Sequence, residues 1–310
     1  MAARSSLIPA FTGEVLAWGA PRLRDLPWRE TRDPWAVLVS EVMLQQTQVA
    51  RVIPRWHAFI DRFPTPEACA ATPLADVLRE WQGLGYPRRA RNLHATARRV
   101  TELGGFPLDL AGLLALPGIG PYTARALMAF AFELDAAVVD TNIARVYARV
   151  VGERLTPKRV QSLADDACPS GDAWVWNQCL MDLGAVLCRP HRPACDECPV
   201  RGRCVWQGST ERPDPAVGSS GVSTTQARFE GSDRQARGRL MKALSAGHVA
   251  EHDVAAVMQR SDETATRLVD DLVADGLCRR DGSIITLPIE ERAWIEERAG
   301  SRNGSSINRP

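Results

Sequence analysis

The chain has 310 residues, 45% of them hydrophobic, and its 38 Lys and Arg side chains nearly balance 37 Asp and Glu, giving a formal net charge of +1 at pH 7. A chain of this length can bury a substantial core and is long enough for two domains. Because the charge is nearly neutral, any affinity for nucleic acid must come from local basic patches. No apolar run approaches the roughly 20 residues of a membrane span, and the N-terminal segment lacks the apolar stretch of a secretory signal.

Eight cysteines in such a chain indicate a reducing compartment, where thiols bind metals rather than pair as disulfides. We therefore expect a cytoplasmic location. Four of the eight have no metal-ligand spacing and are expected to be small buried side chains: Cys69, Cys168, Cys179 and Cys278.

Residues 11 to 203 carry apolar side chains at helical spacing, with short breaks at Pro, Gly and Asp and no sustained two-residue alternation. This pattern predicts an all-α region. Within it, Glu41 stands in the apolar stretch VLVSEVML, where burial would raise the pKa of its carboxyl and keep a proton available for transfer. The alternative is a glutamate with a structural hydrogen bond.

The segment LPGIGPYTA, residues 116–124, predicts a tight turn between two helices, with Gly118 and Gly120 allowing close backbone approach. Such a turn can direct backbone N–H groups at a phosphate. Downstream, VVDTNIARV places Asp140 just before a helix that begins near Asn142, where aspartate is a preferred N-cap.

Four further cysteines form a C-x6-C-x2-C-x5-C run, at Cys188, Cys195, Cys198 and Cys204. Four thiolates select an iron–sulfur cluster or zinc. Structural zinc sites more often use two C-x2-4-C pairs held apart by a longer spacer, so this single compact loop favours a 4Fe–4S cluster. Arginines such as Arg189 and Arg192 surround the ligands and could contact phosphates, although arginines that solvate a surface loop would look the same.

The C-terminal third has a different composition. Residues 207–232 are rich in Gly, Ser, Thr and Pro and predict a flexible linker. Residues 233–288 predict three helices and then a two-stranded ribbon turned at Asp281–Gly282, which suggests a small winged-helix-like α+β module. The tail at 289–310 is expected to be partly disordered.

Several segments together carry a family resemblance: LPWRETRDPW (26–35), SEVMLQQTQV (40–49), GLGYPRRARNL (83–93) and WNQCLMDLGA (176–185), with the LPGIG turn and the cysteine loop. They resemble the adenine DNA glycosylase family of the helix-hairpin-helix, or endonuclease III, superfamily over roughly residues 10–206. The resemblance implies a helix-hairpin-helix glycosylase fold at 1–206. That fold is two helical lobes, one of them holding the cluster loop at 188–204.

The resemblance also implies catalytic roles. An enzyme of this family flips a nucleotide out of double-stranded DNA, protonates the base and stabilises positive charge on the sugar. It makes Glu41 the general acid and Asp140 the carboxylate that stabilises the sugar, with Tyr122 and Asn142 ordering Asp140 and water. Superfamily members that also cut the strand carry a lysine nucleophile at the hairpin position of Tyr122. The chain has only Lys158 and Lys242, so we expect no efficient strand-cleaving lyase.

Further positions match the family's DNA and base contacts. Trp28, Arg29 and Asp182 match the base pocket, although Trp28 could equally be an ordinary core residue. Gln45, Gln46 and Tyr86 match residues that wedge into the duplex. Arg88 could clamp phosphate, or lie on a solvated helix face.

Three departures from the family pattern leave alternatives open. The family commonly has Glu where this chain has Asp182, and Thr141 follows Asp140 where the family has Gly. Both features are similar to thymine or uracil mismatch glycosylases. The Phe-Ser-His turn that senses 8-oxoguanine in a Nudix-like C-terminal domain is missing from the sequence. The winged-helix-like region could contact duplex backbone or a protein partner, or only stabilise the chain.

The sequence therefore predicts a monofunctional, monomeric base excision repair enzyme associated with the nucleoid. Its expected substrate is adenine opposite 8-oxoguanine or guanine. A T:G or U:G mismatch glycosylase is the second hypothesis. A third, from another class, is an iron–sulfur winged-helix DNA-binding regulator without enzymatic activity, which would leave Glu41, Tyr122 and Asp140 without a role.

Overall fold

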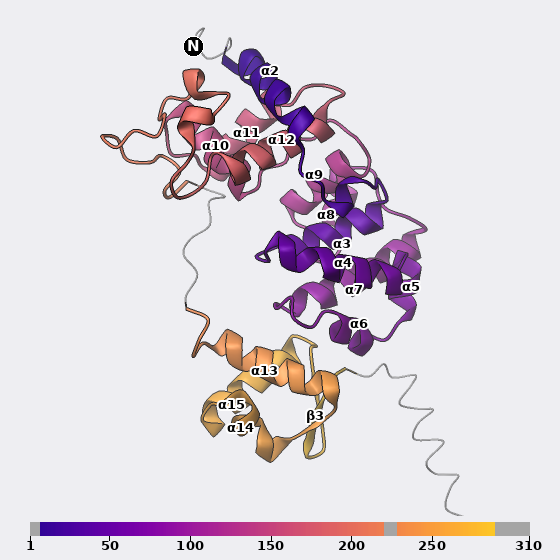
Figure 1. Cartoon of the computed structure of the whole chain (residues 1–310). Helices are drawn as coiled ribbons and strands as arrows, with labels where there is room; N and C mark the ends of the chain where they lie inside the picture. Colours follow the sequence, from indigo (N-terminus) through magenta and orange to yellow (C-terminus); the bar gives the residue numbers. More distant parts are fainter. Residues whose placement is uncertain (1–6, 220–227, 289–310) are drawn as a thin grey trace, which may run out of the picture. The chain divides into compact units, whose positions relative to one another are not determined.

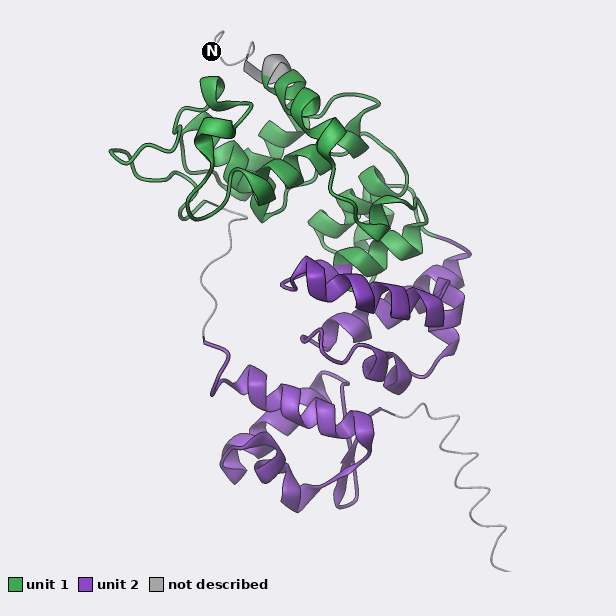
Figure 2. Ribbon diagram, viewed as in Figure 1, with its two compact units in different colours: residues 1–41, 106–225 green, residues 42–105, 226–310 purple. Residues whose placement is uncertain are grey.

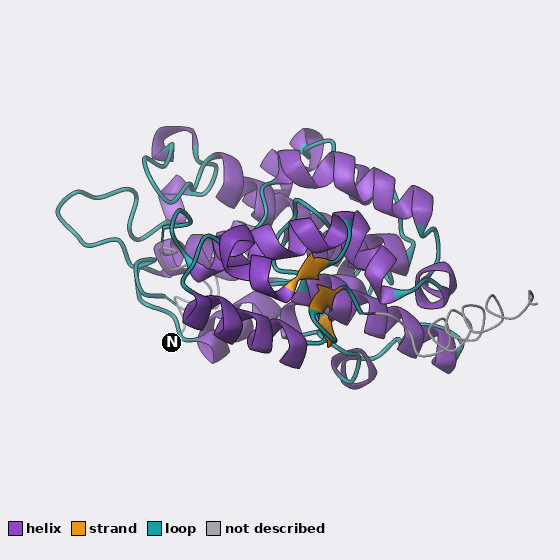
Figure 3. Cartoon of the chain, turned by 90° about the horizontal axis from the view of Figure 1, so that it is seen from below, coloured by secondary structure: helices purple, strands orange, loops and turns teal. Residues whose placement is uncertain are grey.

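The computed structural model describes residues 7–219 and 228–288, and they form two compact units. Unit 1 comprises residues 1–41 and 106–225, and unit 2 comprises residues 42–105 and 226–310 (Figure 2). Helices make up most of the described chain, and its strands gather in one small sheet (Figure 3). Within the described residues, no helix is long and apolar enough to cross a membrane.

Unit 1 is helical, as the hydrophobic periodicity predicted. Its elements, labelled in Figure 1 where there is room, are α2 (Leu7–Gly19), η1 (Ala20–Arg22), η2 (Pro27–Arg29), α3 (Pro34–Leu44, whose last residues belong to unit 2), α8 (Leu110–Leu114), α9 (Pro121–Phe130), α10 (Thr141–Val151), α11 (Pro157–Ala167), α12 (Ala173–Val186), η3 (Cys195–Glu197) and η4 (Arg201–Arg203).

Side-chain caps fix where several of these helices begin. Asp109, Asp140 and Thr156 each accept a hydrogen bond from the backbone N–H three residues later, which satisfies an otherwise unpaired donor. The predicted cap at Asp140 is therefore confirmed. Helix α9 begins differently: extended Gly120 precedes Pro121, whose fixed φ suits a first helical position.

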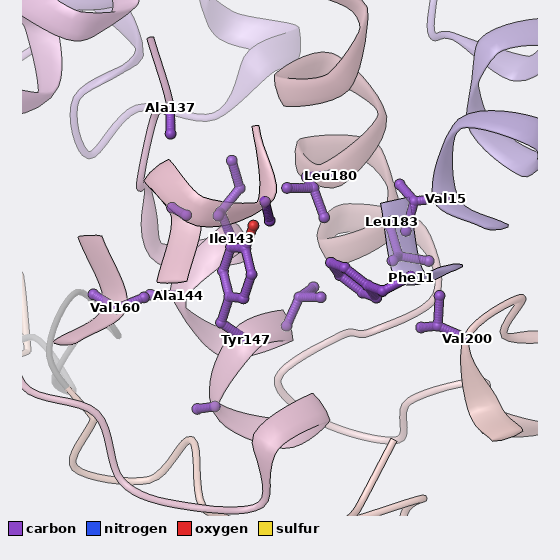
Figure 4. Packing of buried hydrophobic residues seen from close by; sticks show 14 of the residues in the cluster. Phe11, Val15, Ala137, Ile143, Ala144, Tyr147, Val160, Leu180, Leu183 and Val200 are labelled. Carbon is purple, nitrogen blue, oxygen red and sulfur yellow. The ribbon is translucent and has the colours of Figure 1, made fainter. Parts of the chain in front are cut away.

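The core of unit 1 joins α2 to α10, α11 and α12, so residues near the N-terminus pack against residues more than a hundred positions later. Figure 4 shows the centre of this cluster, where Phe11 lies among Tyr147, Leu180 and Leu183. The ring of Phe11 meets the edge of Trp176 at 5.6 Å between centroids. The first helix and the last helices of unit 1 therefore share one core.

Helices α10 and α12 approach closely at one glycine. A Cβ on Gly184 would lie 2.6 Å from the Cβ of Asn142 and 3.0 Å from its carbonyl oxygen. Only glycine fits there without displacing the backbone. This contact places Asn142, and with it the start of α10, at a fixed distance from α12.

Unit 2 contains helices from two parts of the sequence. Its elements are α4 (Val49–Arg62), α5 (Pro66–Ala71), α6 (Leu74–Glu80), α7 (Arg88–Leu103), α13 (Asp233–Ala246), β1 (Val249–Ala250), η5 (Glu251–Asp253), α14 (Val254–Met258), α15 (Asp262–Ala274), β2 (Arg279–Asp281) and β3 (Ile284–Thr286).

The C-terminal part has the predicted three helices, α13 to α15, and the predicted ribbon of β2 and β3. One strand was not predicted: β1 pairs antiparallel with β3, which gives the sheet order β1-β3-β2. Two residues are too few for a two-residue alternation to be visible in the sequence.

The segment predicted as a linker is partly packed. Ala216 is buried in the core of unit 1, the Ser219 hydroxyl accepts a hydrogen bond from the N–H of Leu155, and Asp214 pairs with Arg149. Residues 207–219 therefore differ from the predicted flexible linker, because core and ion-pair contacts fix them. Residues 220–227 of that linker and the whole predicted tail, residues 289–310, lie outside the described residues.

Replacing Gly184 by alanine is expected to destabilise the protein by about 1–3 kcal/mol, the usual cost of overpacking a core. The new methyl group would collide with the backbone of Asn142 rather than with a movable side-chain tip. Denaturant unfolding measures the change. The matched control is Gly13→Ala at an exposed position of α2, where a Cβ meets nothing within 4 Å and stability is expected to rise by up to about 1 kcal/mol. Equal stabilities of the two variants would contradict the packing argument.

Candidate active site and cysteine-lined cavity

Glu41 lies in the second half of α3 and is only 6% exposed. Its carboxyl is hydrogen-bonded to the hydroxyl of Tyr122, the second residue of α9. Burial raises the pKa of Glu41 to about 7, reinforced by Asp140, against the lowering effects of the Tyr122 hydrogen bond and Arg29. Glu41 Oε2 is buried without a hydrogen-bond partner. The predicted burial and raised pKa are confirmed.

Asp140 is the N-cap of α10, and both of its oxygens accept hydrogen bonds. Oδ1 accepts from the N–H of Ile143 at 2.7 Å and Oδ2 from Nδ2 of Asn142 at 2.9 Å. Loss of water raises the pKa of Asp140, while these hydrogen bonds and the charge of Arg145 oppose the rise. The structure therefore brings Glu41, Tyr122, Asp140 and Asn142 together, with two carboxyl groups in different environments.

Two buried arginines, one turn apart on α10, connect Asn142 to the cysteine loop through hydrogen bonds. Arg145 donates to Oδ1 of Asn142 at 2.7 Å, to the carbonyl of Gly184 at 2.7 Å and to the carbonyl of Cys188 at 2.6 Å. Arg149 donates to Sγ of Cys188 at 3.3 Å. An unbroken set of hydrogen bonds thus runs from the Asp140 carboxyl to a cysteine sulfur.

Arg149 also holds the loop from other sides. It donates to the carbonyls of Arg189 and Pro190 and pairs with Asp214 at 2.6 Å. Its guanidinium lies 4.5 Å from the ring centroid of Trp206. Every one of these contacts is to the segment 188–214, so α10 serves as its internal support.

Cys188, Cys195, Cys198 and Cys204 line one cavity, closed by apolar side chains from α10 and α12 such as Val146 and Leu183. Within residues 7–219 and 228–288, no group of three or more His, Cys, Asp or Glu side chains is arranged to hold a metal ion. The backbone N–H of Gln207 donates to Sγ of Cys204 at 3.3 Å, a contact suited to a sulfur that carries negative charge.

The predicted base-pocket residues lie on η2 and α12. Arg29 forms a two-point ion pair with Asp182, with both N–O distances 2.9 Å, and both side chains are buried. Arg24 donates to the same carboxylate through Nε at 2.6 Å and through its backbone N–H at 3.0 Å. Burial alone would raise the pKa of Asp182, but the hydrogen bonds from Arg29 and Arg24 lower it. Arg29 and Arg24 thus donate hydrogen bonds to both carboxylate oxygens of Asp182. Trp28, which precedes Arg29 in the sequence, is buried.

The three predicted wedge residues lie in two loops of unit 2, before α4 and before α7. Gln46 and Tyr86 both have left-handed backbone, with φ of 58° and 49°. Arg89 joins the two loops: its guanidinium donates to the carbonyls of Val42, Met43 and Gln45 at 2.7–3.0 Å, and to those of Leu84 and Gly85 at 2.9 and 3.1 Å.

The remaining predicted DNA contacts have the following places. Gly118 has a φ of 72° in the turn before α9, as a tight turn requires. Gly120 has extended backbone and is the N-cap of α9. Arg189 and Arg192 are exposed in the cysteine loop. Arg88 is exposed but pairs with Asp275 of the C-terminal part of unit 2.

Sequence reasoning missed three of the arginines that support the site: Arg24, Arg145 and Arg149. For the α10 pair a signal was present, because NIARVYARVV places two arginines four residues apart on a helix that is otherwise apolar. Arginine at such positions is buried only with partners. For Arg24 the partner is Asp182, 158 residues away, and no local pattern reports such a pair.

Comparison with known proteins identifies the family of this chain. The family model described as "HhH-GPD superfamily base excision DNA repair protein" matches residues 39–170. The chain is 40% identical over 273 residues to a Mycolicibacterium smegmatis protein named adenine DNA glycosylase, covering 85% of this chain and 91% of that protein. The chain belongs to the adenine DNA glycosylase family.

Solved structures show the same fold. A thermostable thymine-DNA glycosylase is 32% identical with a TM-score of 0.64, covering 66% of this chain and 99% of that one. An endonuclease III trapped as a covalent intermediate with DNA is 24% identical with a TM-score of 0.60, covering 67% and 99%. This chain thus has an endonuclease III-type fold, as the sequence predicted.

The raised pKa of Glu41 makes stability depend on pH. Between pH 4.5, its ordinary pKa, and about 7, the unfolded state ionises while the folded state keeps the proton, so stability falls as pH rises. Glu41→Gln, which cannot ionise, is expected to gain stability over the natural chain across this window, by up to about 3 kcal/mol. Denaturant unfolding from pH 4.5 to 8 measures the difference. Glu153→Gln, an exposed site, is the matched control, and a difference at Glu41 that does not change with pH would refute the assignment.

Proposed function

We propose that this protein is a monofunctional DNA glycosylase of base excision repair that hydrolyses the N-glycosidic bond of adenine mispaired with 8-oxoguanine or guanine. The observation that carries the proposal is the pair Glu41 and Asp140: a buried carboxyl of raised pKa beside a capped carboxyl. Membership of the adenine DNA glycosylase family supplies the substrate class. The partner is duplex DNA, bound by a monomer.

Glu41 acts as general acid. With a pKa of about 7 it holds a proton at neutral pH and gives it to a nitrogen of the flipped adenine, which makes the base a better leaving group. The electron pair of the glycosidic bond leaves with the base. Tyr122, hydrogen-bonded to Glu41, holds the carboxyl in one orientation.

Asp140 acts on the sugar. Departure of the base leaves positive charge on the sugar ring, which a carboxylate on the opposite side stabilises. The donors on both oxygens, Ile143 and Asn142, favour its ionised form against burial and fix its direction. Water then adds at C1′ and loses a proton, which completes hydrolysis and leaves an abasic site. Because Tyr122 stands where strand-cutting members of the superfamily carry a lysine nucleophile, we expect no efficient strand cleavage.

Arg29 and Trp28 are proposed to line the adenine pocket, with Arg29 held by Asp182. Because Arg24 and Arg29 occupy the Asp182 carboxylate, its role in reading the base is to fix Arg29 rather than to contact adenine. A shorter Asp at this position suits a carboxylate that two arginines surround.

Cys188, Cys195, Cys198 and Cys204 are proposed to hold one 4Fe–4S cluster, which they fit because all four line one cavity. One compact loop with a single C-x2-C pair would suit a cluster better than a structural zinc ion, which more often uses two such pairs held apart by a longer spacer. The bound group supplies structural pinning of the loop that presents Arg189 and Arg192 to phosphates.

The second candidate is a thymine or uracil mismatch glycosylase, favoured by the solved thymine-DNA glycosylase at 32% identity. The decisive experiment is single-turnover base release by cluster-loaded protein from duplexes with A opposite 8-oxoguanine, A opposite guanine and T opposite guanine. Alkali then cleaves the abasic sites. We expect adenine release, fastest opposite 8-oxoguanine. Thymine release alone would move the chain to the second candidate, and binding without release of any base would support the DNA-binding regulator.

Two variants control that experiment. Asp140→Asn and Glu41→Gln are expected to lower adenine release by at least about 100-fold, the usual contribution of general acid catalysis, while duplex binding persists. Near-native release by Asp140→Asn would contradict the mechanism.

Iron and acid-labile sulfide analysis tests the cluster. We expect about four of each per chain, lost together in Cys198→Ser, with weaker duplex binding because the loop is no longer pinned. Cys278→Ser, a buried cysteine of the C-terminal part, is the matched control and should keep its iron. Stoichiometric zinc in the natural protein would exclude the cluster.

A further inference from the structure

The C-terminal part of unit 2 packs against α6 and makes hydrogen bonds to residues between 82 and 91. Gln82 Nε2 donates to the carbonyl of Met241 at 3.2 Å, and Arg88 Nε donates to Asp275 Oδ2 at 2.5 Å. Arg91 donates to the carbonyl of the same Asp275. These contacts come from both the end of α6 and the start of α7, so they secure the loop between those helices from outside.

Tyr86 is at the centre of that loop. Nη1 of Arg234, in the first turn of α13, donates to the Tyr86 hydroxyl at 2.9 Å. The Arg234 guanidinium also lies 5.9 Å from the centroid of the Tyr86 ring and 5.2 Å from that of Phe229. The end of the tyrosine side chain is therefore held by a residue almost 150 positions away.

The backbone end of Tyr86 is fixed as well. Its φ of 49° is left-handed, a conformation that a tyrosine keeps only where surrounding contacts determine it. Arg89 supplies such contacts through the carbonyls of Leu84 and Gly85 and places its guanidinium 5.4 Å from the Tyr86 ring centroid. Arg89 holds the backbone of this loop and Arg234 holds the Tyr86 hydroxyl, so the orientation of the Tyr86 ring is fixed at both ends.

We propose that Arg234 is a positioning residue for Tyr86, through which the C-terminal part sets how Tyr86 enters the duplex beside the mispair. This inference rests on the proposed function, in which Tyr86 is a wedge. A wedge that opens a base stack must keep its own direction while the stack resists, so a ring fixed before binding loses less freedom on insertion. The C-terminal part then contributes to excision without touching the flipped base.

The test is a double-mutant cycle in full-length, cluster-loaded protein. Arg234→Met, Tyr86→Phe and the double variant are compared for single-turnover adenine release, for duplex affinity, and for fluorescence of 2-aminopurine placed next to the mispair, which reports insertion. Arg280→Met is the matched control: it removes the same charge from a residue that pairs with Glu251 and Asp270, both in the C-terminal part.

We expect Arg234→Met and Tyr86→Phe each to slow release and insertion about three- to tenfold, as for loss of one charged hydrogen bond, with affinity changing less. The double variant should be no slower than either single one, because both remove the same contact. Arg234→Lys, which keeps a donor, should recover part of the rate, and Arg280→Met should match the natural protein.

Three results would overturn the inference: natural rates in Arg234→Met, additive losses in the double variant, or an equal loss in Arg280→Met. The last would mean that Arg234 acts through charge rather than through Tyr86. If Arg234→Met does not fold, the comparison of Arg234→Lys with Tyr86→Phe decides by the same criteria. Natural rates in Arg234→Met, with adenine release intact in the natural protein, would reject this inference alone. Failure of the natural protein to release adenine from any duplex would reject the proposed function, and this inference with it.

Discussion

The structure of unit 1 depends on two buried arginine side chains of helix α10. Arg145 and Arg149 lie in its buried face, and neither could remain there without donors being satisfied. The acceptors are carbonyls and a sulfur of the cysteine loop, the carbonyl of Gly184 and the side chain of Asn142. One helix thus joins the capped carboxyl at its N-terminus to the loop at its far end.

The same principle recurs where the chain must fix a shape without regular secondary structure. Arg29 and Arg24 surround Asp182, and Arg89 gathers the carbonyls of two loops. A planar guanidinium with five donors can satisfy several acceptors at once, which a lysine ammonium does less well. The preference of this chain for arginine, with lysine only at 158 and 242, therefore has structural use beyond charge.

The sequence indicated what is local. The cap at Asp140, the turn at Gly118, the apolar surroundings of Glu41 and the three C-terminal helices each depend on neighbours within a few residues, and each is present. What could not be predicted is long-range pairing. Arg149 with Asp214 and Arg234 with Tyr86 join segments 65 and 148 residues apart, and no periodicity reports which distant polar groups will meet. The packing of residues 207–219 was missed for the same reason, because its composition resembles a linker.

Because some arginines are buried and others are exposed, their electrostatic interactions respond differently to salt. Dissolved ions screen exposed charges within about 10 Å at 0.1 M salt but reach buried pairs far less. The Arg29–Asp182 pair is 6% and 3% exposed, so rising ionic strength leaves it in place, whereas Arg189 and Arg192 stand in solvent. Under the proposed function, the salt dependence of duplex affinity would report how many exposed arginines contact phosphates, and the buried Arg29–Asp182 pair would not contribute to it.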